Sequence, residues 1–234
     1  MLLELDGGRV ITDPLLRGHV GPLVRVVPPA PTPAAVDCVL VSHLHPAHAD
    51  LPTLRSLNRT GPVLVPSHSA DWLIGRGLTG VREMVPAQTT AVGDLTIRAT
   101  RASHGARRRT FGPSAQPLGF LVQSTVSVYF AGNTRAFAEM AELRGQVDVA
   151  LVSVADCHSV RRRGRSTPEE AAATVALIDP EVVIPIHWGT LSLAGAPSAP
   201  TQRSAPAREF AVHVRRYAPR VRICTLEPTQ RIVL

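Results

Sequence analysis

Short apolar runs separated by turn-forming residues recur along the chain, and they predict many short strands with a few helices between them. Residues 39–41, 63–65, 118–123, 127–131, 147–154 and 182–186 have the length and aliphatic content of buried strands. Residues 92–100 instead alternate between apolar and polar side chains around a turn at Gly93 and Asp94, as half-buried strands do. Strands interspersed with helices are typical of an α/β fold.

Two stretches combine helical periodicity with residues that favour the start of a helix. Asp50 is expected to cap a helix that has Pro52 in its first turn and leucines at helical spacing. Thr167 is expected to cap another, because Pro168 suits the first helical position and the acids after it favour the positive end of the helix dipole. Residues 69–78 and 209–217 also predict helices.

Hairpins are predicted at both ends of the chain. Residues 2–12 place a two-glycine turn between two short apolar strands. Residues 222–224 and 231–233 are expected to pair with each other as a terminal hairpin.

The remaining connections are predicted from their composition. The Pro-rich segment 13–33 should be irregular, and residues 192–207, rich in Ala, Pro, Ser and Gly, should form an exposed mobile loop. The chain shows neither a short-period repeat nor a boundary in composition. We therefore expect one α/β domain over residues 1–234.

Three histidines lie directly after the first buried strand, at His43, His45 and His48. Open α/β sheets bind their ligands at the carboxyl ends of strands, so this loop is a candidate for chemistry. Neutral imidazole is the commonest protein ligand for zinc, and the spacing of His43 and His45 lets both face one ion. The loop therefore predicts a metal site.

Four later segments extend this observation. They are Arg101-Ala102-Ser103-His104, Tyr129-Phe130-Ala131-Gly132-Asn133-Thr134, Ser166-Thr167-Pro168-Glu169-Glu170-Ala171 and Ile184-Pro185-Ile186-His187-Trp188-Gly189-Thr190. Together with the histidine loop, and in this order, they resemble the metallo-β-lactamase superfamily, whose histidine motif is His-x-His-x-Asp-His. The resemblance extends over nearly the whole chain and is closest to the branch of the ascorbate-6-phosphate lactonases and the N-acyl-phosphatidylethanolamine phospholipases D.

The resemblance implies a four-layer αβ/βα sandwich with a first metal site made by His43, His45 and His104, all of which are present. Three neutral imidazoles leave a fourth tetrahedral position for water, and zinc lowers the pKa of such a water to about 7. We expect one zinc ion here. Imidazole also binds manganese and iron, so the sequence leaves the identity of the metal open.

The family's second metal site departs from its pattern in this chain. Ala47 stands where the motif has its Asp, and Asn133 stands where the family has an Asp that bridges two metals. His48 and His187 remain as ligands, without either carboxylate to compensate a dication. We expect this second site to be weak or empty, which makes the dinuclear site degenerate.

The missing Asp also removes a candidate catalytic base, since base catalysis contributes about 10²–10⁴-fold. Asp156 and His158 follow the strand at 147–154 and are candidates to compensate, alongside His48 and Asn133 as catalytic residues. The alternative for Asp156 and His158 is an ordinary loop role. Cys157 is interpreted as an inert thiol.

Charge and composition bear on the substrate. The net charge is +7 and every one of the 25 basic residues is Arg. Arginines cluster at 107–109 and at 161–165, where they are either solvated loop residues or a site for an anionic substrate. Aromatic residues make up only 4%, which leaves little for base stacking, so nucleic acid is disfavoured as a partner.

The location is predicted from cysteines and hydropathy. Cys38, Cys157 and Cys224 are few and widely spaced, as expected for reduced thiols in a cytoplasmic protein. No apolar run is long enough for a transmembrane segment, and the acidic start does not match a signal peptide. The sequence leaves open whether the chain forms a homo-oligomer.

Two functions follow from these observations. The first is a metal-dependent hydrolase that uses one zinc ion to cleave an ester, a lactone or a phosphodiester of a small anionic substrate. The second is a pseudoenzyme, a relative that kept the scaffold as a binding or regulatory protein after losing both carboxylates.

Overall fold

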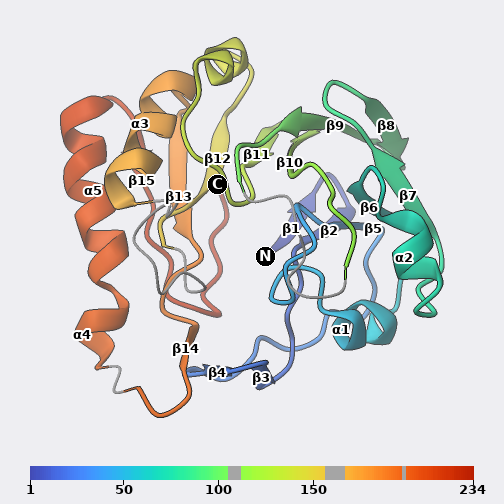
Figure 1. Cartoon of the computed structure of the whole chain (residues 1–234). Helices are drawn as coiled ribbons and strands as arrows, with labels where there is room; N and C mark the ends of the chain where they lie inside the picture. The colour runs from blue at the N-terminus through green and yellow to red at the C-terminus, as the bar shows by residue number, and fades with distance from the viewer. Residues whose placement is uncertain (105–111, 156–166, 197–198) are drawn as a thin grey trace.

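Two β-sheets packed face to face form the centre of the protein in a computed structural model (Figure 1), which describes residues 1–104, 112–155, 167–196 and 199–234. The first sheet has the order β1-β2-β5-β6-β7, with bounds Leu2–Leu5, Gly8–Thr12, Cys38–Leu40, Val63–Pro66 and Val81–Met84. The second has the order β15-β13-β12-β11-β10-β9-β8, with bounds Arg222–Ile223, Val182–Ile186, Val149–Ser153, Ser127–Phe130, Leu118–Gln123, Leu95–Arg101 and Thr89–Val92.

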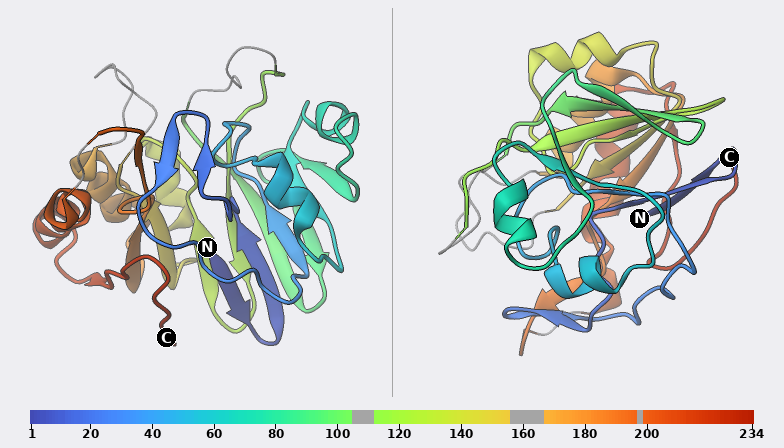
Figure 2. Two further views of the ribbon diagram at one scale, coloured as in Figure 1. Left: turned by 90° about the horizontal axis from the view of Figure 1, so that it is seen from below. Right: turned by 90° about the vertical axis from the view of Figure 1, so that its right-hand side faces the viewer.

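Helices cover the outer faces of both sheets (Figures 1 and 2). Helices α1 (Leu51–Ser56) and α2 (Ala70–Ile74) share an apolar cluster with the first sheet. Helices α3 (Pro168–Ile178) and α5 (Ala205–Tyr217) and the 3₁₀ helix η1 (Ala138–Leu143) share another with the second sheet. The order helix, sheet, sheet, helix is the four-layer αβ/βα sandwich that the sequence predicts.

The burial of β5 on both faces explains why its sequence is continuously apolar. Cys38 and Leu40 belong to the cluster between the two sheets, where Phe120 and Phe130 lie opposite, whereas Val39 and Val41 pack toward α1 and α2. Successive side chains of a strand point to opposite faces, so a strand with helices on one side and a sheet on the other has no polar face.

Strand direction brings the strand ends that precede the candidate residues to one edge. In the first sheet β2 and β5 are parallel neighbours. In the second, β9 and β11 both run antiparallel to β10, and β12 and β13 are parallel to β11. Their carboxyl ends therefore meet at the same edge of the sandwich, and the loops that leave them build the candidate site.

A small third sheet corrects one prediction about loops and adds regular structure to a second predicted loop, whose mobility stays a prediction. Strands β3 (His19–Val20) and β4 (Leu23–Arg25) form a hairpin inside the segment predicted to be irregular, and β14 (Leu191–Leu193) pairs with β4. Residues 192–207, predicted as a mobile loop, contain the end of β14, the short helix α4 (Pro200–Arg203) and the start of α5. Strands of two or three residues are too short to show a periodicity in the sequence. In addition, β14 lies far from its partner β4 along the chain, so no local pattern predicts their pairing.

Both predicted helix caps are confirmed. The Asp50 carboxylate accepts a hydrogen bond from the Thr53 backbone at the start of α1. Thr167 forms a capping box with Glu170 at the start of α3, with Pro168 in the first turn. These caps depend on residues a few positions apart, which is why the sequence alone predicts them.

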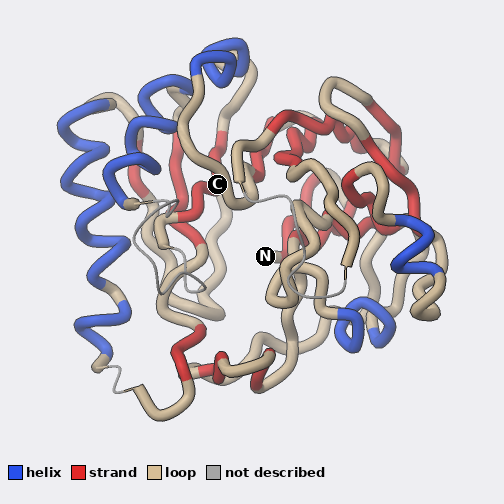
Figure 3. The backbone as a smooth tube through the Cα atoms, viewed as in Figure 1, coloured by secondary structure: helices blue, strands red, loops and turns tan. Residues whose placement is uncertain are grey.

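The predicted terminal hairpin is wrong. Strand β15 instead pairs in parallel with β13, and residues 224–234 are loop and turn (Figure 3). The open edge of β13 offers backbone donors and acceptors within an existing sheet, whereas an isolated two-stranded hairpin is only marginally stable. None of the described helices is long and apolar enough to cross a membrane.

Candidate metal centre

The candidate site lies where loops from both sheets meet. His43, His45 and His48 follow β5 of the first sheet, and the segments with the other candidates follow three strands of the second sheet. These candidates are His104 after β9, Asn133 after β11 and His187 after β13. The strand directions thus bring together residues as far apart in the sequence as His43 and His187.

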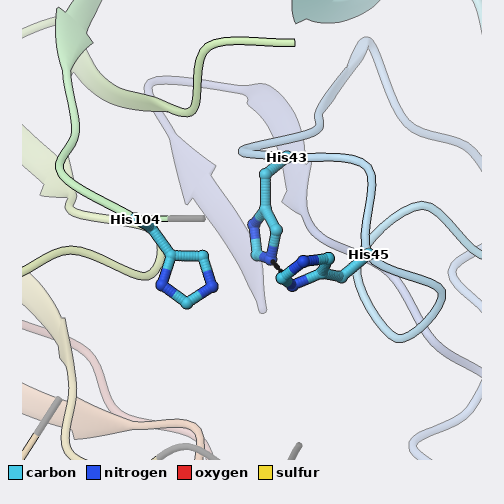
Figure 4. Close-up of side chains that lie close together, drawn as sticks. All are labelled: His43, His45 and His104. Carbon is cyan, nitrogen blue, oxygen red and sulfur yellow. Dashed lines mark hydrogen bonds between the residues drawn. The ribbon is translucent and has the colours of Figure 1, made fainter. Parts of the chain in front are cut away.

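His43, His45 and His104 form a compact group of nitrogen donors (Figure 4). One donor nitrogen from each lies within 4.8 Å of the others. The Nε2 atom of His43 and the Nδ1 atom of His45 are 3.0 Å apart. Two nitrogens bound to one tetrahedral zinc at about 2.0–2.1 Å stand about 3.3 Å apart, so this spacing fits a shared ion.

Burial favours neutral imidazole in this group. His43 is only 1% exposed, and this burial lowers its pKa well below the usual value. The neighbouring histidines, His48 and His45 foremost, lower it further because adjacent positive charges repel. A neutral imidazole keeps a lone pair free for a metal, so protonation does not compete with metal binding at neutral pH.

The second group consists of His48, His187 and Asn133, and the ring of His48 also lies 4.1 Å from that of His43, centroid to centroid. The rings of His48 and His187 stack with their centroids 5.1 Å apart. His187 has a left-handed backbone with φ of 66°, and its Nδ1 contacts the carbonyl of Ala155, which orients its Nε2 away from that carbonyl. Within the described residues, the His48 Nε2 and the Asn133 Oδ1 are buried and have no hydrogen-bond partner. Two unpartnered buried acceptors are what a cation or a water molecule would satisfy.

Gly132 allows the Asn133 loop to approach the histidine loop. Gly132 has φ of +61°, and a Cβ atom there would lie 2.7 Å from the Cβ of Ser42. Its carbonyl accepts a hydrogen bond from the Ser153 hydroxyl at 2.8 Å. The glycine in this segment therefore serves a close contact between the two sheets, beside the buried Asn133.

The side chain of Ala47 packs against apolar residues. It is buried with 7% exposure in a small apolar cluster with Val20 and Leu23, against which Leu15 and Leu191 pack. The cluster joins the histidine loop to the small sheet of β3, β4 and β14. A carboxylate here would be buried among aliphatic side chains unless a metal or a donor compensated its charge.

Asp13 is a site residue that the sequence analysis missed. It follows β2, and its carboxylate lies 2.6 Å from the Nδ1 of His48. Asp13, His43 and His48 also have donor atoms within 4.8 Å of one another, as possible metal ligands do. The position of Asp13 directly after a predicted strand could have indicated a site residue. An Asp-Pro pair after a strand, however, is also typical of a simple turn.

Several predicted site residues lie outside the described residues. They are Asp156, Cys157 and His158, together with the arginines at 107–109 and 161–165. The hypotheses that Asp156 or His158 compensates for the lost carboxylates, and that these arginines hold a substrate, stay predictions.

Comparison with known families agrees with the fold and the histidine geometry. A family model described as the beta-lactamase superfamily domain matches residues 8–188, a range that includes every histidine of the candidate site. The chain belongs to this family. The resemblance to the metallo-β-lactamase superfamily is thereby confirmed, whereas the assignment to one branch stays a prediction.

Individual relatives and one solved structure are also similar to the chain. A UPF0173 protein of Pyrococcus furiosus is 35% identical over 160 residues, which cover 67% of this chain and 69% of that protein. A UPF0173 metal-dependent hydrolase of Methanopyrus kandleri is 34% identical and covers 80% of each chain. The structure of a metallo hydrolase from Ignicoccus hospitalis has a TM-score of 0.69 at 21% identity, covering 97% of this chain and 91% of that one. At this identity the likeness shows the fold alone.

Proposed function

We propose that the protein is a metal-dependent hydrolase with one zinc ion held by His43, His45 and His104. The 3.0 Å spacing of the His43 Nε2 and the His45 Nδ1, with a His104 nitrogen in the same group, carries this proposal. Family membership and the metal-dependent hydrolases among the relatives support it.

When bound, zinc with three protein ligands would supply a coordinated water of lowered pKa and a Lewis acid for the scissile group. The burial of His43 keeps its imidazole neutral and available as a ligand. His48 and Asn133, both buried, would contact the substrate or its attacking water beside His43, whose ring lies 4.1 Å from that of His48. The reaction would be hydrolysis of an ester, a lactone or a phosphodiester.

The lack of a carboxylate at Ala47 and at Asn133 supports one ion rather than two. Ala47 offers no donor atom, and the Asn133 carbonyl carries no charge to compensate a second dication. A small anionic substrate is proposed because a pocket without these carboxylates repels anions less, and because the chain carries a net charge of +7.

Metal analysis together with hydrolysis assays tests this function. The purified protein, equilibrated with zinc and desalted, should retain about one zinc per chain. It should hydrolyse bis(p-nitrophenyl) phosphate or a p-nitrophenyl ester, lose this activity with a chelator and regain it with zinc. The variant His43→Ala should lose both zinc and activity. His213→Gln, on the outer helix α5, is the matched control and should keep both.

The second candidate is a binding or regulatory protein without catalysis, and the absence of both carboxylates favours it. It predicts that the folded wild-type protein retains no zinc, or retains zinc without hydrolysing any of these substrates. Two tightly held zinc ions would instead contradict the single-ion part of the proposal.

A further inference from the structure

The carboxylate of Asp13 forms hydrogen bonds with two residues of the histidine loop, Ser42 and His48. Its side chain is only 9% exposed. Asp13 Oδ1 accepts a hydrogen bond from the Ser42 backbone at 2.7 Å. Asp13 Oδ2 accepts one from the Ser42 hydroxyl and contacts the His48 Nδ1 at 2.6 Å. Both oxygens are thus occupied by protein donors, which argues against Asp13 as a direct metal ligand.

The contact with Asp13 determines which nitrogen of His48 carries the proton. An ionised carboxylate only accepts hydrogen bonds, so the Nδ1 of His48 must be the donor. A neutral imidazole then has its lone pair on Nε2. That Nε2 atom is buried and has no partner within the described part of the chain, so the lone pair is available to a ligand in the pocket.

The same carboxylate reaches the first group through Ser42. The Ser42 hydroxyl has one proton, which it donates to Asp13, so in its contact of 2.9 Å with the His43 Nδ1 the hydroxyl oxygen must accept from that nitrogen. His43 therefore also has its lone pair on Nε2, the atom that lies 3.0 Å from the His45 Nδ1.

We infer that Asp13 is the positioning residue of this site, since it sets the tautomer and ring orientation of one histidine in each group. It acts on His48 directly and on His43 through Ser42. With Ala47 and Asn133 neutral, Asp13 also brings a negative charge to within one hydrogen bond of the pocket. Carboxylates that hold the far nitrogen of a metal-binding histidine raise its basicity as a ligand. The inference rests on the proposed metal site.

The variant Asp13→Asn tests this role because the surrounding donors dictate how the new amide must lie. The amide oxygen is needed to accept from the Ser42 backbone, so the amide NH₂ would face His48 and the Ser42 hydroxyl. It would donate to the His48 Nδ1 and move the proton of that imidazole to Nε2, where it blocks a ligand. NMR of the imidazole nitrogens in the metal-free protein should show His48 as the Nδ1–H tautomer in the wild type and as the Nε2–H tautomer in Asp13→Asn.

Zinc affinity supplies the second readout. Asp13→Asn should weaken zinc binding by about 10–100-fold, the range known for partners of metal-binding histidines. Ser42→Ala should weaken zinc binding while leaving the His48 tautomer unchanged, because it cuts only the branch to His43. Asp148→Asn is the matched control, since Asp148 likewise accepts from a backbone N–H, that of Ser127 at 2.7 Å, but lies away from the site. It should change neither readout.

Each possible result either supports or contradicts the positioning role of Asp13. An Nε2–H tautomer of His48 in the metal-free wild type would overturn the inference, even if Asp13→Asn failed to fold. So would a folded Asp13→Asn protein with an unchanged tautomer and zinc affinity within about twofold of the wild type. A wild type that binds no zinc but shows the expected tautomers would instead refute the proposed function and leave the positioning role of Asp13 supported.

Discussion

The two halves of the site differ in how completely they keep the elements of a metal centre. The first half, His43, His45 and His104, has three nitrogen donors within 4.8 Å of one another. The second half has His48 and His187, and Ala47 and Asn133 stand at the positions where the resemblance implies aspartates. The loop after β5 carries histidines of both halves, so the comparison concerns the side chains around them.

Ala47 and Asn133 lie in different surroundings. Ala47 is part of an apolar cluster with Val20 and Leu23, so a methyl group there stabilises the contact between the histidine loop and the small sheet. Asn133 keeps the shape of an aspartate, and its Oδ1 is buried without a partner in the described residues. Ala47 is therefore part of an apolar cluster, whereas Asn133 keeps a buried polar oxygen.

The largest difference in zinc affinity should appear when one histidine is removed from each half in turn. His45→Ala should weaken zinc binding by more than about 100-fold, because the loss of a direct ligand exceeds the loss of an orienting partner. His187→Ala should weaken it by less than about threefold if the single ion lies in the first half. Isothermal titration with zinc measures both, and equal losses would mean that the two halves share the ion.

The second-largest effect should come from disturbing the close contact between Gly132 and Ser42, which joins the two sheets. Gly132→Ala should lower the free energy of unfolding by about 2 kcal/mol, because the new Cβ would meet Ser42 and the backbone is left-handed. Gly145→Ala is the matched control: φ is +74° there but nothing lies within 4 Å, so only the backbone strain of about 1 kcal/mol remains. Urea unfolding compares the two, and equal losses would show that the contact with Ser42 contributes nothing.

Restoring the acids should remove the difference between the halves. In the double variant Ala47→Asp and Asn133→Asp, metal content should rise toward two zinc ions and phosphodiesterase activity should rise with it. Without metal the same variant should be less stable by about 1–2 kcal/mol, because it buries uncompensated carboxylates. Zinc analysis and unfolding with a chelator test this; no change in metal content or activity would show that the pocket has diverged beyond these two positions.

The smallest effect should be a dependence of stability on pH. The folded pKa of His43 lies below its unfolded value of about 6.5, so the unfolded chain binds more protons as the pH falls. The metal-free protein should keep its stability above about pH 6.5 and lose up to about 1.4 kcal/mol per pH unit below it for this one group. Urea unfolding at about pH 7.5 and about pH 5.5 measures the loss. His43→Asn should flatten it and His213→Gln should not; an unchanged slope in His43→Asn would assign it to other groups.

Local patterns predicted most of the scaffold. The caps at Asp50 and Thr167, the amino-terminal hairpin and the strands around the site follow from residues close together in the sequence. The terminal hairpin failed because β15 pairs with β13, a strand about 40 residues earlier in the chain. The pairing of distant segments depends on which other strands have an unpaired backbone edge. A local sequence pattern contains no information about those strands.

By itself the sequence determined the order of the candidate segments, and it predicted their ligand types and the lack of a carboxylate at Ala47 and Asn133, because these are properties of individual residues. The tertiary structure alone decided that Ala47 belongs to an apolar cluster and that Asp13 holds His48 and Ser42. Both depend on strand pairing: β2 and β5 are parallel neighbours, so the residues after them meet although 35 positions separate Asp13 from His48. A carboxylate found only through space therefore orients histidines that the sequence alone could identify.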